Sequence, residues 1–204
     1  MAKTILLYGG GIDSTVLLHL LCFRGEDVHA VFFQYGQKAE TLEFEACSYF
    51  CRKLGVPLTA LRLPIGEISI SAILSGGALA NDPAINILDG RNFALIAMAG
   101  MFAAKIDADK IAMGYHVEPV TRPFPDASIE FVHAINKMIP QAFVHKFEVV
   151  APMSEWTRED IFAYAKSLDS DVLDRAHTCY EDVAGGCGKC SHCLLKAQML
   201  EDLK

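Results

Sequence analysis

A run of three glycines near the start of the chain has the residue types and the spacing of a phosphate-binding loop. Residues 9–11 are the glycines. An apolar run at residues 5–8 precedes them, and Asp13 and Ser14 follow. A strand, a glycine turn and a helix N-terminus in this order present unpaired backbone N–H groups and the positive end of a helix dipole to an anion. No Gly-Lys-Ser/Thr follows, so the loop is not a Walker A motif. The pattern favours a nucleotide phosphate site, and an ordinary tight turn is the alternative.

Four cysteines close to the C-terminus have the spacing of a metal site. They form a C-x8-C-x2-C-x2-C motif of Cys179, Cys187, Cys190 and Cys193. Four thiolates at these separations can surround a tetrahedral Zn²⁺ at about 2.3 Å each, and zinc is favoured over an iron–sulfur cluster because nothing in the sequence indicates redox chemistry. With all four ligands supplied by the protein, we expect a structural metal that fixes the C-terminal segment near the catalytic cleft. Core or surface thiols without a metal are the alternative.

The other cysteines, and the histidines beside the metal motif, are assigned no ligand role. Cys22, Cys47 and Cys51 lie in expected helices without a matching spacing, so small buried hydrophobic side chains are their simplest interpretation. His177 and His192 flank the motif and are either hydrogen-bonding partners of the ligands or without a role.

The composition predicts a single folded domain over residues 1–204 and excludes several classes of protein. Hydrophobic residues make up 52% of the chain and the mean hydropathy is +0.27, which excludes disorder, yet no apolar run reaches the ~18 residues of a membrane span. The chain begins with an expected strand and no secretory signal, so we expect a cytoplasmic enzyme. A formal charge of −7 without a long basic run argues against direct nucleic-acid binding.

The elements that must position these residues alternate between strands and helices. Their order implies an α/β fold, a doubly wound, Rossmann-like parallel sheet with the ligand at the carboxyl ends of the strands. Residues 64–89 and 118–126 are expected to be loops, the first with one helical turn, and Ser154 or Thr157 is expected to cap the last helix. Strands are expected at residues 5–8, 28–33, 58–63, 110–114 and 147–150, and helices from Ser14 and Thr15 through residue 21, then at 39–54, 92–105, 129–138 and 158–167.

The glycine loop resembles the pyrophosphate loop of the ATP pyrophosphatase (PP-loop) superfamily, which is written Ser-Gly-Gly-x-Asp-Ser. Residues 10–14 match its last five positions, and Gly9 stands where the family has serine, so one hydroxyl contact is missing. The resemblance implies an adenine nucleotide alpha hydrolase-like sheet. It also implies an ATP site formed by Tyr8, Gly9, Gly10, Gly11, Ile12, Asp13, Ser14, Thr15 and Gly114.

Loop and cysteine motif together resemble one family of that superfamily, the 7-cyano-7-deazaguanine synthases (QueC) of the queuosine pathway. Further segments are similar to motifs of the same family, and the resemblance covers most of the chain. These segments are residues 35–38 (Tyr-Gly-Gln-Lys), 90–92 (Gly-Arg-Asn), 125–126 (Pro-Asp) and 178–180 (Thr-Cys-Tyr). The relatives also imply a homodimer.

Members of that family use ATP to activate the carboxylate of 7-carboxy-7-deazaguanine, and ammonia is then added and water removed to give the nitrile. The resemblance implies that Asp13 holds Mg²⁺ or orients the loop. It implies that Lys38 and Arg91 contact phosphate or carboxylate, unless they are only solvated charges. Asn92 either caps a helix or binds a ligand. The implied catalytic residues are Asp13, Ser14, Lys38 and Arg91, and the implied substrate-binding residues are Tyr35, Gln37, Arg91, Asn92, Pro125 and Asp126.

The sequence departs from the family on the side expected to bind the base. Where the family has Tyr-Pro-Asp-Cys-Arg, residues 124–128 are Phe-Pro-Asp-Ala-Ser, and whether Glu118 replaces an acidic residue of the family stays open. The changed acceptor side leaves two alternatives. One is an enzyme that joins the activated deazaguanine to an amine of a protein partner, as in antiphage defence. The other is a non-catalytic nucleotide or base sensor. A tRNA thiolation enzyme fits less well, because it needs a reactive sulfur relay and four cysteines are assigned to the metal.

Overall fold

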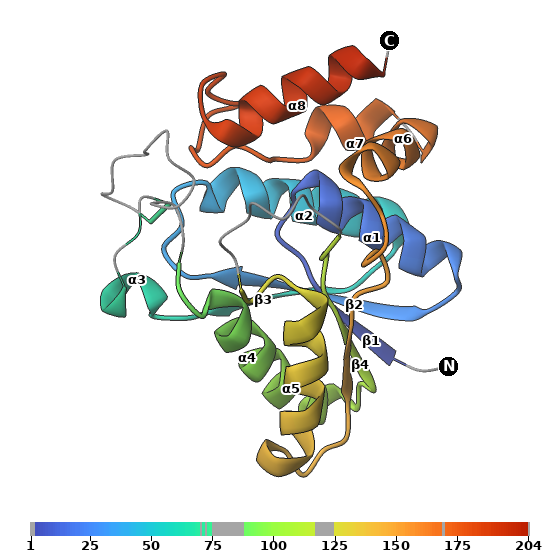
Figure 1. Ribbon diagram of the computed structural model, residues 1–204, viewed down its shortest axis with the longest axis vertical. Coiled ribbons are helices and arrows are strands. Elements are labelled where there is room, and N and C mark those ends of the chain that lie inside the picture. The colour runs from blue at the N-terminus through green and yellow to red at the C-terminus, as the bar shows by residue number, and fades with distance from the viewer. Residues whose placement is uncertain are drawn as a thin grey trace.

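The fold is built on one parallel β-sheet of five strands, seen in the computed structural model in Figure 1. The structure describes residues 3–69, 71, 73–74, 88–116, 125–168 and 170–203. The strand order β3-β2-β1-β4-β5 means that the chain winds outward from β1 and then returns to its other side, so the predicted doubly wound sheet is confirmed. The strands are β1 (Lys3–Leu7), β2 (Asp27–Gln34), β3 (Leu58–Arg62), β4 (Lys110–Ala112) and β5 (Glu148–Val150).

The first strand takes the central position because its side chains can be buried on both faces of the sheet. Ile5 and Leu6 have no exposed surface, and they point into two different hydrophobic cores. Leu6 pairs in register with Ala30 of β2 and with Ala112 of β4. A continuous apolar run without alternation is typical of a parallel strand that is covered on both faces.

Two layers of helices cover the sheet, one on each face (Figure 1). Val16, Phe50 and Ile161 form part of the core under the first layer, and Ile96 and Ile135 form part of the core under the second. No helix among the described residues combines the length and the apolar character needed to cross a membrane. The first layer contains α1 (Ile12–Phe23), α2 (Glu40–Leu54), α6 (Arg158–Leu168), α7 (Ser170–Arg175) and α8 (Ser191–Asp202), and the second contains α4 (Arg91–Ile106) and α5 (Ile129–Ala142).

Several helix boundaries differ from those expected. Helix α1 begins at Ile12 and not at Ser14, because Gly11 has the extended conformation of an N-cap and its carbonyl accepts from the N–H of Thr15. Helix α5 continues past residue 138 through Pro140, where a proline in the last turn removes only one backbone hydrogen bond. Helices α7 and α8 were not among the expected elements. Thr157 does cap α6, because its Oγ1 accepts from the N–H of Asp160 at 3.2 Å.

Parts of both expected loops can be compared with the structure. The single helical turn expected after β3 is present as α3 (Ile65–Ile68). Residues 75–87 and 117–124 lie outside the described residues, and they include Glu118 and Phe124. Beyond the second gap, Ser128 stands where the resembled family has arginine. Its hydroxyl accepts from the N–H of Phe131 at 3.1 Å and so caps α5.

Candidate active site

A cleft of about 380 Å³ opens at the carboxyl ends of β1, β2 and β4, next to the point where the strand order reverses. This is where an open α/β sheet binds its ligand. The predicted residues absent from its described lining are Gly10, Thr15, Lys38, Pro125, Cys187, Cys190 and Cys193. The predicted residues that line the cleft are Tyr8, Gly9, Gly11, Ile12, Asp13, Ser14, Tyr35, Gln37, Arg91, Asn92, Gly114, Asp126 and Cys179.

The glycine loop is fixed by close backbone contacts on its inner side and is open on its outer side. Gly10 has φ +74°, and a Cβ there would lie 2.5 Å from the carbonyl oxygen of Glu43, so only glycine fits. A Cβ on Gly114 would lie 3.5 Å from the backbone nitrogen of Ser14. At Gly9, by contrast, an added Cβ would meet no atom within 4 Å. The missing serine of the resembled family therefore leaves open space at the cleft surface.

Two predicted nucleotide residues support the loop from inside. The hydroxyls of Tyr8 and Thr15 are 3.0 Å apart and hydrogen-bonded, and both side chains are buried. The hydroxyl of Ser14 donates to the carbonyl of Gly11 at 3.2 Å, which ties the first turn of α1 together. Thr15 is thus a supporting residue behind the loop, whereas Ser14 lies on the cleft wall.

Asp13 keeps a negative charge at the mouth of the loop. Burial by itself raises the pKa of this carboxyl, but hydrogen bonding and charge from His116, with smaller effects from Arg158 and His192, outweigh burial, and the net pKa is lowered. Nε2 of the buried His116 lies 3.6 Å from Oδ2 of Asp13. An ionised carboxylate beside a row of N–H groups is suited to hold a cation that accompanies a phosphate.

Arg91 brings a positive charge to the other side of the cleft. It is the first residue of α4, which follows Gly90 in the left-handed conformation. Its guanidinium donates to the hydroxyl of Tyr35 at 3.3 Å, and this neighbour raises the pKa of Arg91 more than burial lowers it. Arg91 is therefore a fixed cation within the cleft, as expected for a group that contacts phosphate or carboxylate.

The hydrogen bonds of Asn92 bear on whether it caps α4 or is available to a ligand. The carboxylate of Asp126 accepts from the backbone N–H of Asn92 at 2.9 Å, so Asp126 satisfies the N-terminus of α4. The side-chain amide of Asn92 donates to the carbonyl of Asp126 at 3.0 Å and does not cap its own helix. Pro125 is exposed, and its carbonyl accepts from Ser128. These contacts fasten the segment before α5 to the start of α4.

Lys38 forms an ion pair that connects the segment after β2 to the C-terminal part of the chain. Its Nζ lies 3.4 Å from Oε1 of Glu181, two residues after the first metal-motif cysteine. Its backbone N–H donates to the carbonyl of Ile73 at 3.0 Å. The structure thus joins residue 38 to the C-terminal segment, and its predicted contact with phosphate or carboxylate stays a prediction.

Glu43 is a cleft residue that the sequence did not reveal. It lies in the first turn of α2, where it reads as an ordinary acidic residue near a helix start, and its side chain lines the cleft. Burial raises the pKa of Glu43 to about 7, against the lowering effects of a hydrogen bond from Gln37 and of the charge on Arg91. Its position after the motif at residues 35–38, close to the end of β2, was the available signal.

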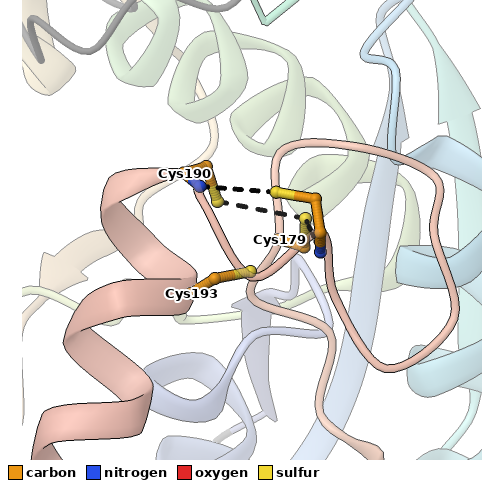
Figure 2. Close-up of side chains that lie close together, drawn as sticks. Cys179, Cys190 and Cys193 are labelled. Carbon is orange, nitrogen blue, oxygen red and sulfur yellow. Dashed lines mark hydrogen bonds between the residues drawn. The ribbon is translucent and has the colours of Figure 1, made fainter.

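The four cysteines of the predicted metal site converge on one point (Figure 2). All four Sγ atoms lie within 4.8 Å of one another, and those of Cys179 and Cys190 are 3.9 Å apart. A tetrahedral zinc ion with Zn–S bonds of about 2.3 Å requires sulfur atoms about 3.8 Å apart, so the residues fit this metal. Gly186, at φ +89°, allows the close approach, because a Cβ there would lie 2.9 Å from Sγ of Cys193.

Backbone N–H groups point at these sulfur atoms, as they do around thiolate ligands. The N–H groups of Glu181 and Cys187 both donate to Sγ of Cys179 at 3.3 Å, and that of Cys190 donates to Sγ of Cys187 at 3.4 Å. Hydrogen bonds from the N–H of Lys189 and its neighbours lower the pKa of Cys187 to about 6. The remaining cysteines are not part of the cluster: Cys47 and Cys51 are buried and Cys22 is partly buried.

The segment at residues 177–193, which carries the four cysteines, lies at the cleft, as expected for the C-terminal part of the chain. The N–H of His177 donates to the carbonyl of Gly10 at 2.9 Å, and its ring bonds the carbonyl of Glu181 at 3.0 Å. The hydroxyl of Tyr180 and Nε2 of His192 are 2.9 Å apart. All three side chains line the cleft, so a metal at the cysteines would fix part of its surface.

Comparison with known proteins supports the resemblance to the QueC family. The sequence model of the family described as "Queuosine biosynthesis protein QueC" matches residues 3–204. A 7-cyano-7-deazaguanine synthase from Methanocaldococcus jannaschii is 31% identical over 94% of this chain and 91% of its own length. Another from Marinomonas sp. strain MWYL1 is 28% identical over 94% and 90%.

Solved structures resemble the chain in fold. A 4-thiouridine synthetase in complex with RNA and ATP has a TM-score of 0.61 and 17% identity, and the match covers 99% of this chain and 51% of that one. The U34-tRNA thiolase NcsA from Methanococcus maripaludis, with its [4Fe-4S] cluster, has a TM-score of 0.58 and 14% identity over 99% of this chain and 66% of its own. At these identities the likenesses concern the fold alone, and they confirm the α/β, Rossmann-like fold.

Proposed function

Because this chain belongs to the family of the queuosine biosynthesis protein QueC, we propose that it is an ATP-dependent ligase that converts 7-carboxy-7-deazaguanine into 7-cyano-7-deazaguanine (preQ0). The two relatives described above are named for this product. The single observation that carries the proposal is the cleft itself, in which a pyrophosphate-type loop and a fixed guanidinium face the same space.

The chemistry requires activation because a carboxylate is a poor electrophile. A carboxylate oxygen would attack the α-phosphorus of ATP, forming a mixed anhydride with AMP and releasing pyrophosphate. Ammonia would then attack the acyl carbon, and AMP would leave with the carboxylate oxygen, giving the amide. The amide oxygen would then attack the α-phosphorus of a second ATP and release a second pyrophosphate. AMP would leave with that oxygen, and loss of the two protons of the amide nitrogen would give the nitrile.

The loop residues would serve the departing pyrophosphate. The backbone N–H groups at the start of α1, open toward the cleft at Gly9, would stabilise the negative charge that develops as the pyrophosphate leaves. Asp13 would hold Mg²⁺, and that ion would offset part of the same charge. Ser14 lies beside these groups on the cleft wall.

The opposite side of the cleft would hold the acid. Arg91 would orient the substrate carboxylate, and its bond to Tyr35 fixes the guanidinium for this purpose. Lys38 remains a candidate for a phosphate contact, which would require its ion pair with Glu181 to open. Zinc at the four cysteines would be structural, with no open ligand position.

One assay tests the proposed reaction directly. Purified protein with ATP, Mg²⁺, ammonia and 7-carboxy-7-deazaguanine is expected to form the nitrile, AMP and pyrophosphate, as followed by mass spectrometry. An Asp13→Asn variant is the matched control, because it keeps the side-chain volume and removes the charge. Absence of the nitrile with the folded wild-type protein would overturn the proposal. The expected homodimer and the metal content would be measured on the same sample by light scattering and by elemental analysis.

A further inference from the structure

We propose that Glu43 determines substrate specificity by accepting hydrogen bonds from an adjacent ring N–H and exocyclic amine, the donor pair on the edge of a 2-amino-4-oxopyrimidine ring. The inference deepens the proposed function and rests on it, because 7-carboxy-7-deazaguanine carries this edge. It assigns a role to a cleft residue outside the predicted motif positions.

The side chain of Glu43 is held in place by the protein and can still accept hydrogen bonds from a ligand. One oxygen, Oε2, accepts from the side-chain amide of Gln37 at 3.1 Å. The backbone fixes the side-chain amide of Gln37. Its nitrogen also donates to the carbonyl of Phe33 at 2.9 Å, and its oxygen accepts from the N–H of Tyr35 at 2.9 Å. Among the described residues, no donor bonds the other oxygen, Oε1, of Glu43. The carboxylate is thus oriented by the protein and still able to accept hydrogen bonds.

Glu43 and Arg91 are opposite charges in one cleft that do not pair directly. Each influences the pKa of the other, yet within the described chain they form no ion pair. Both side chains are half-buried, and two such charges left apart in one cleft can be satisfied together by a ligand that carries a donor edge and an anion. An aminopyrimidinone carboxylic acid has both groups, one for each side chain.

The pKa of Glu43 is consistent with a carboxylate that has one donor, Gln37, and room for others. Burial raises it to about 7, although Gln37 and Arg91 act in the opposite direction. Two ligand N–H groups would favour the ionised form and bring the pKa down again. The adenine ring of ATP presents an amine next to an unprotonated ring nitrogen, so it does not offer the same pair of donors.

Helix α2 supplies a matched control one turn before Glu43. Glu40 accepts from the side-chain amide of Gln34 at 3.0 Å, in a bond that resembles that of Glu43 with Gln37. Glu40 is not among the described residues that line the cleft. A Glu40→Gln substitution therefore changes the same chemical group on the same helix without touching the proposed ligand.

The test compares the acid with an analogue that lacks its 2-amino group, in wild-type protein and in Glu43→Gln and Glu40→Gln variants. An amide cannot accept two hydrogen bonds from the edge with the strength of a carboxylate. We therefore expect Glu43→Gln to raise the KM of the acid on the order of 100-fold and to abolish discrimination against the analogue. The KM of ATP should stay within about twofold, and Glu40→Gln should behave as wild type.

The outcomes separate this inference from the proposed function. Wild-type protein that forms no nitrile would refute the proposed function, and the inference with it. Wild-type protein that forms nitrile but uses the analogue equally well would overturn the role of Glu43 alone, even if the variants do not fold. A Glu43→Gln variant that raises the KM of ATP and leaves that of the acid unchanged would also overturn it, because Glu43 would then contact the nucleotide.

Discussion

The two sides of the cleft are held by different parts of the polypeptide. On the loop side (residues 9–14 with Gly114), the geometry comes from the backbone: Gly10 is pressed against the main chain of α2, and the backbone of Gly114 lies next to that of Ser14 in α1. On the acceptor side (Tyr35, Gln37, Glu43, Arg91 and Asp126), it depends on side-chain hydrogen bonds: Gln37 donates to Glu43, Arg91 donates to Tyr35, and the carboxylate of Asp126 accepts from a backbone N–H of α4. Backbone N–H groups stay in place unless a substitution moves the backbone itself, as one at Gly10 would. An arrangement of side chains, by contrast, changes with a substitution at any of its members.

The same two sides differ in how closely the sequence matches the motifs that it resembles. The loop side keeps five of the six positions of the superfamily motif, while residues 127 and 128, next to Asp126 of the acceptor side, depart from the motif of the resembled family. A loop built from backbone can serve the same phosphate chemistry for many acids. Side chains across the cleft can then be exchanged to select the acid, as we propose for Glu43. The predictions below test this division, beginning with the largest expected effect.

Replacing Asp13 should separate chemistry from folding on the loop side. Asp13→Ala removes the charge at the mouth of the loop, and we expect ATP–pyrophosphate exchange to fall on the order of 10³-fold. The side chain is about one-third exposed, so we expect little change in the thermal midpoint. Exchange measured with radiolabelled pyrophosphate, together with a thermal melt, checks both. Exchange at the wild-type rate would remove Asp13 from the mechanism.

Removing a metal ligand should affect both sides of the cleft at once. Cys190→Ala takes one thiolate from the cluster, and we expect the free energy of unfolding to fall by several kcal/mol, as for other structural zinc sites. His177, which bonds the loop, and Tyr180 belong to the same segment, so activity should be lost as well.

Chelation and elemental analysis test the same point without a substitution. The purified protein should contain about one zinc per chain and little iron, and removal of zinc should lower the denaturation midpoint. Cys22→Ala is a suitable control, because that partly buried thiol lies outside the cluster. A Cys190→Ala protein that is soluble and as stable as wild type would show that the metal has no structural role.

Substitutions at two adjacent glycines of the loop should differ in their effect on stability. Gly10→Ala places a Cβ at 2.5 Å from a backbone oxygen with φ at +74°, and we expect about 2 kcal/mol or more of destabilisation with loss of ATP binding. Gly9→Ser restores the residue type of the superfamily motif into open space, and we expect stability within about 0.5 kcal/mol of wild type. Urea denaturation and ATP titration of both variants check this. Equal damage at the two positions would contradict the described loop.

The same division explains how much the sequence could predict. The glycine loop and the cysteine motif are each local in the sequence, so their residue types and spacings were sufficient to predict that the loop opens on the cleft and that the four cysteines meet. The phosphate and the metal themselves stay predictions. The β-α-β order was likewise sufficient for the parallel sheet. Glu43 escaped notice because only the packing of α2 against the loop brings it into the cleft. Helix α8 also depends on tertiary structure, since it begins directly after a metal-motif cysteine, Cys190.

The smallest expected effect concerns pH and belongs to the acceptor side. The pKa of Glu43 is raised to about 7, so the carboxyl is mostly protonated at pH 6 and mostly ionised at pH 8. Only the ionised form can accept both ligand hydrogen bonds, and we expect kcat/KM for the acid to rise about tenfold between these two values. Among the described residues, the charges of Arg91, Glu40 and Asp182 act on the pKa of Glu43, and the charge of Glu43 acts on that of Tyr35.

The pH profile is best measured by ATP–pyrophosphate exchange, which requires the acid but no ammonia and so avoids the titration of the nucleophile. In Glu43→Gln the rise should disappear, because an amide does not titrate in this range. Glu40→Gln should keep a rise that begins at lower pH, because the charge of Glu40 raises the pKa of Glu43. A Glu43→Gln variant with the same tenfold rise would assign the titration to another group. In that case the acceptor side would bind the base through groups whose charge is constant over this range, and its selectivity would not depend on the ionisation of Glu43.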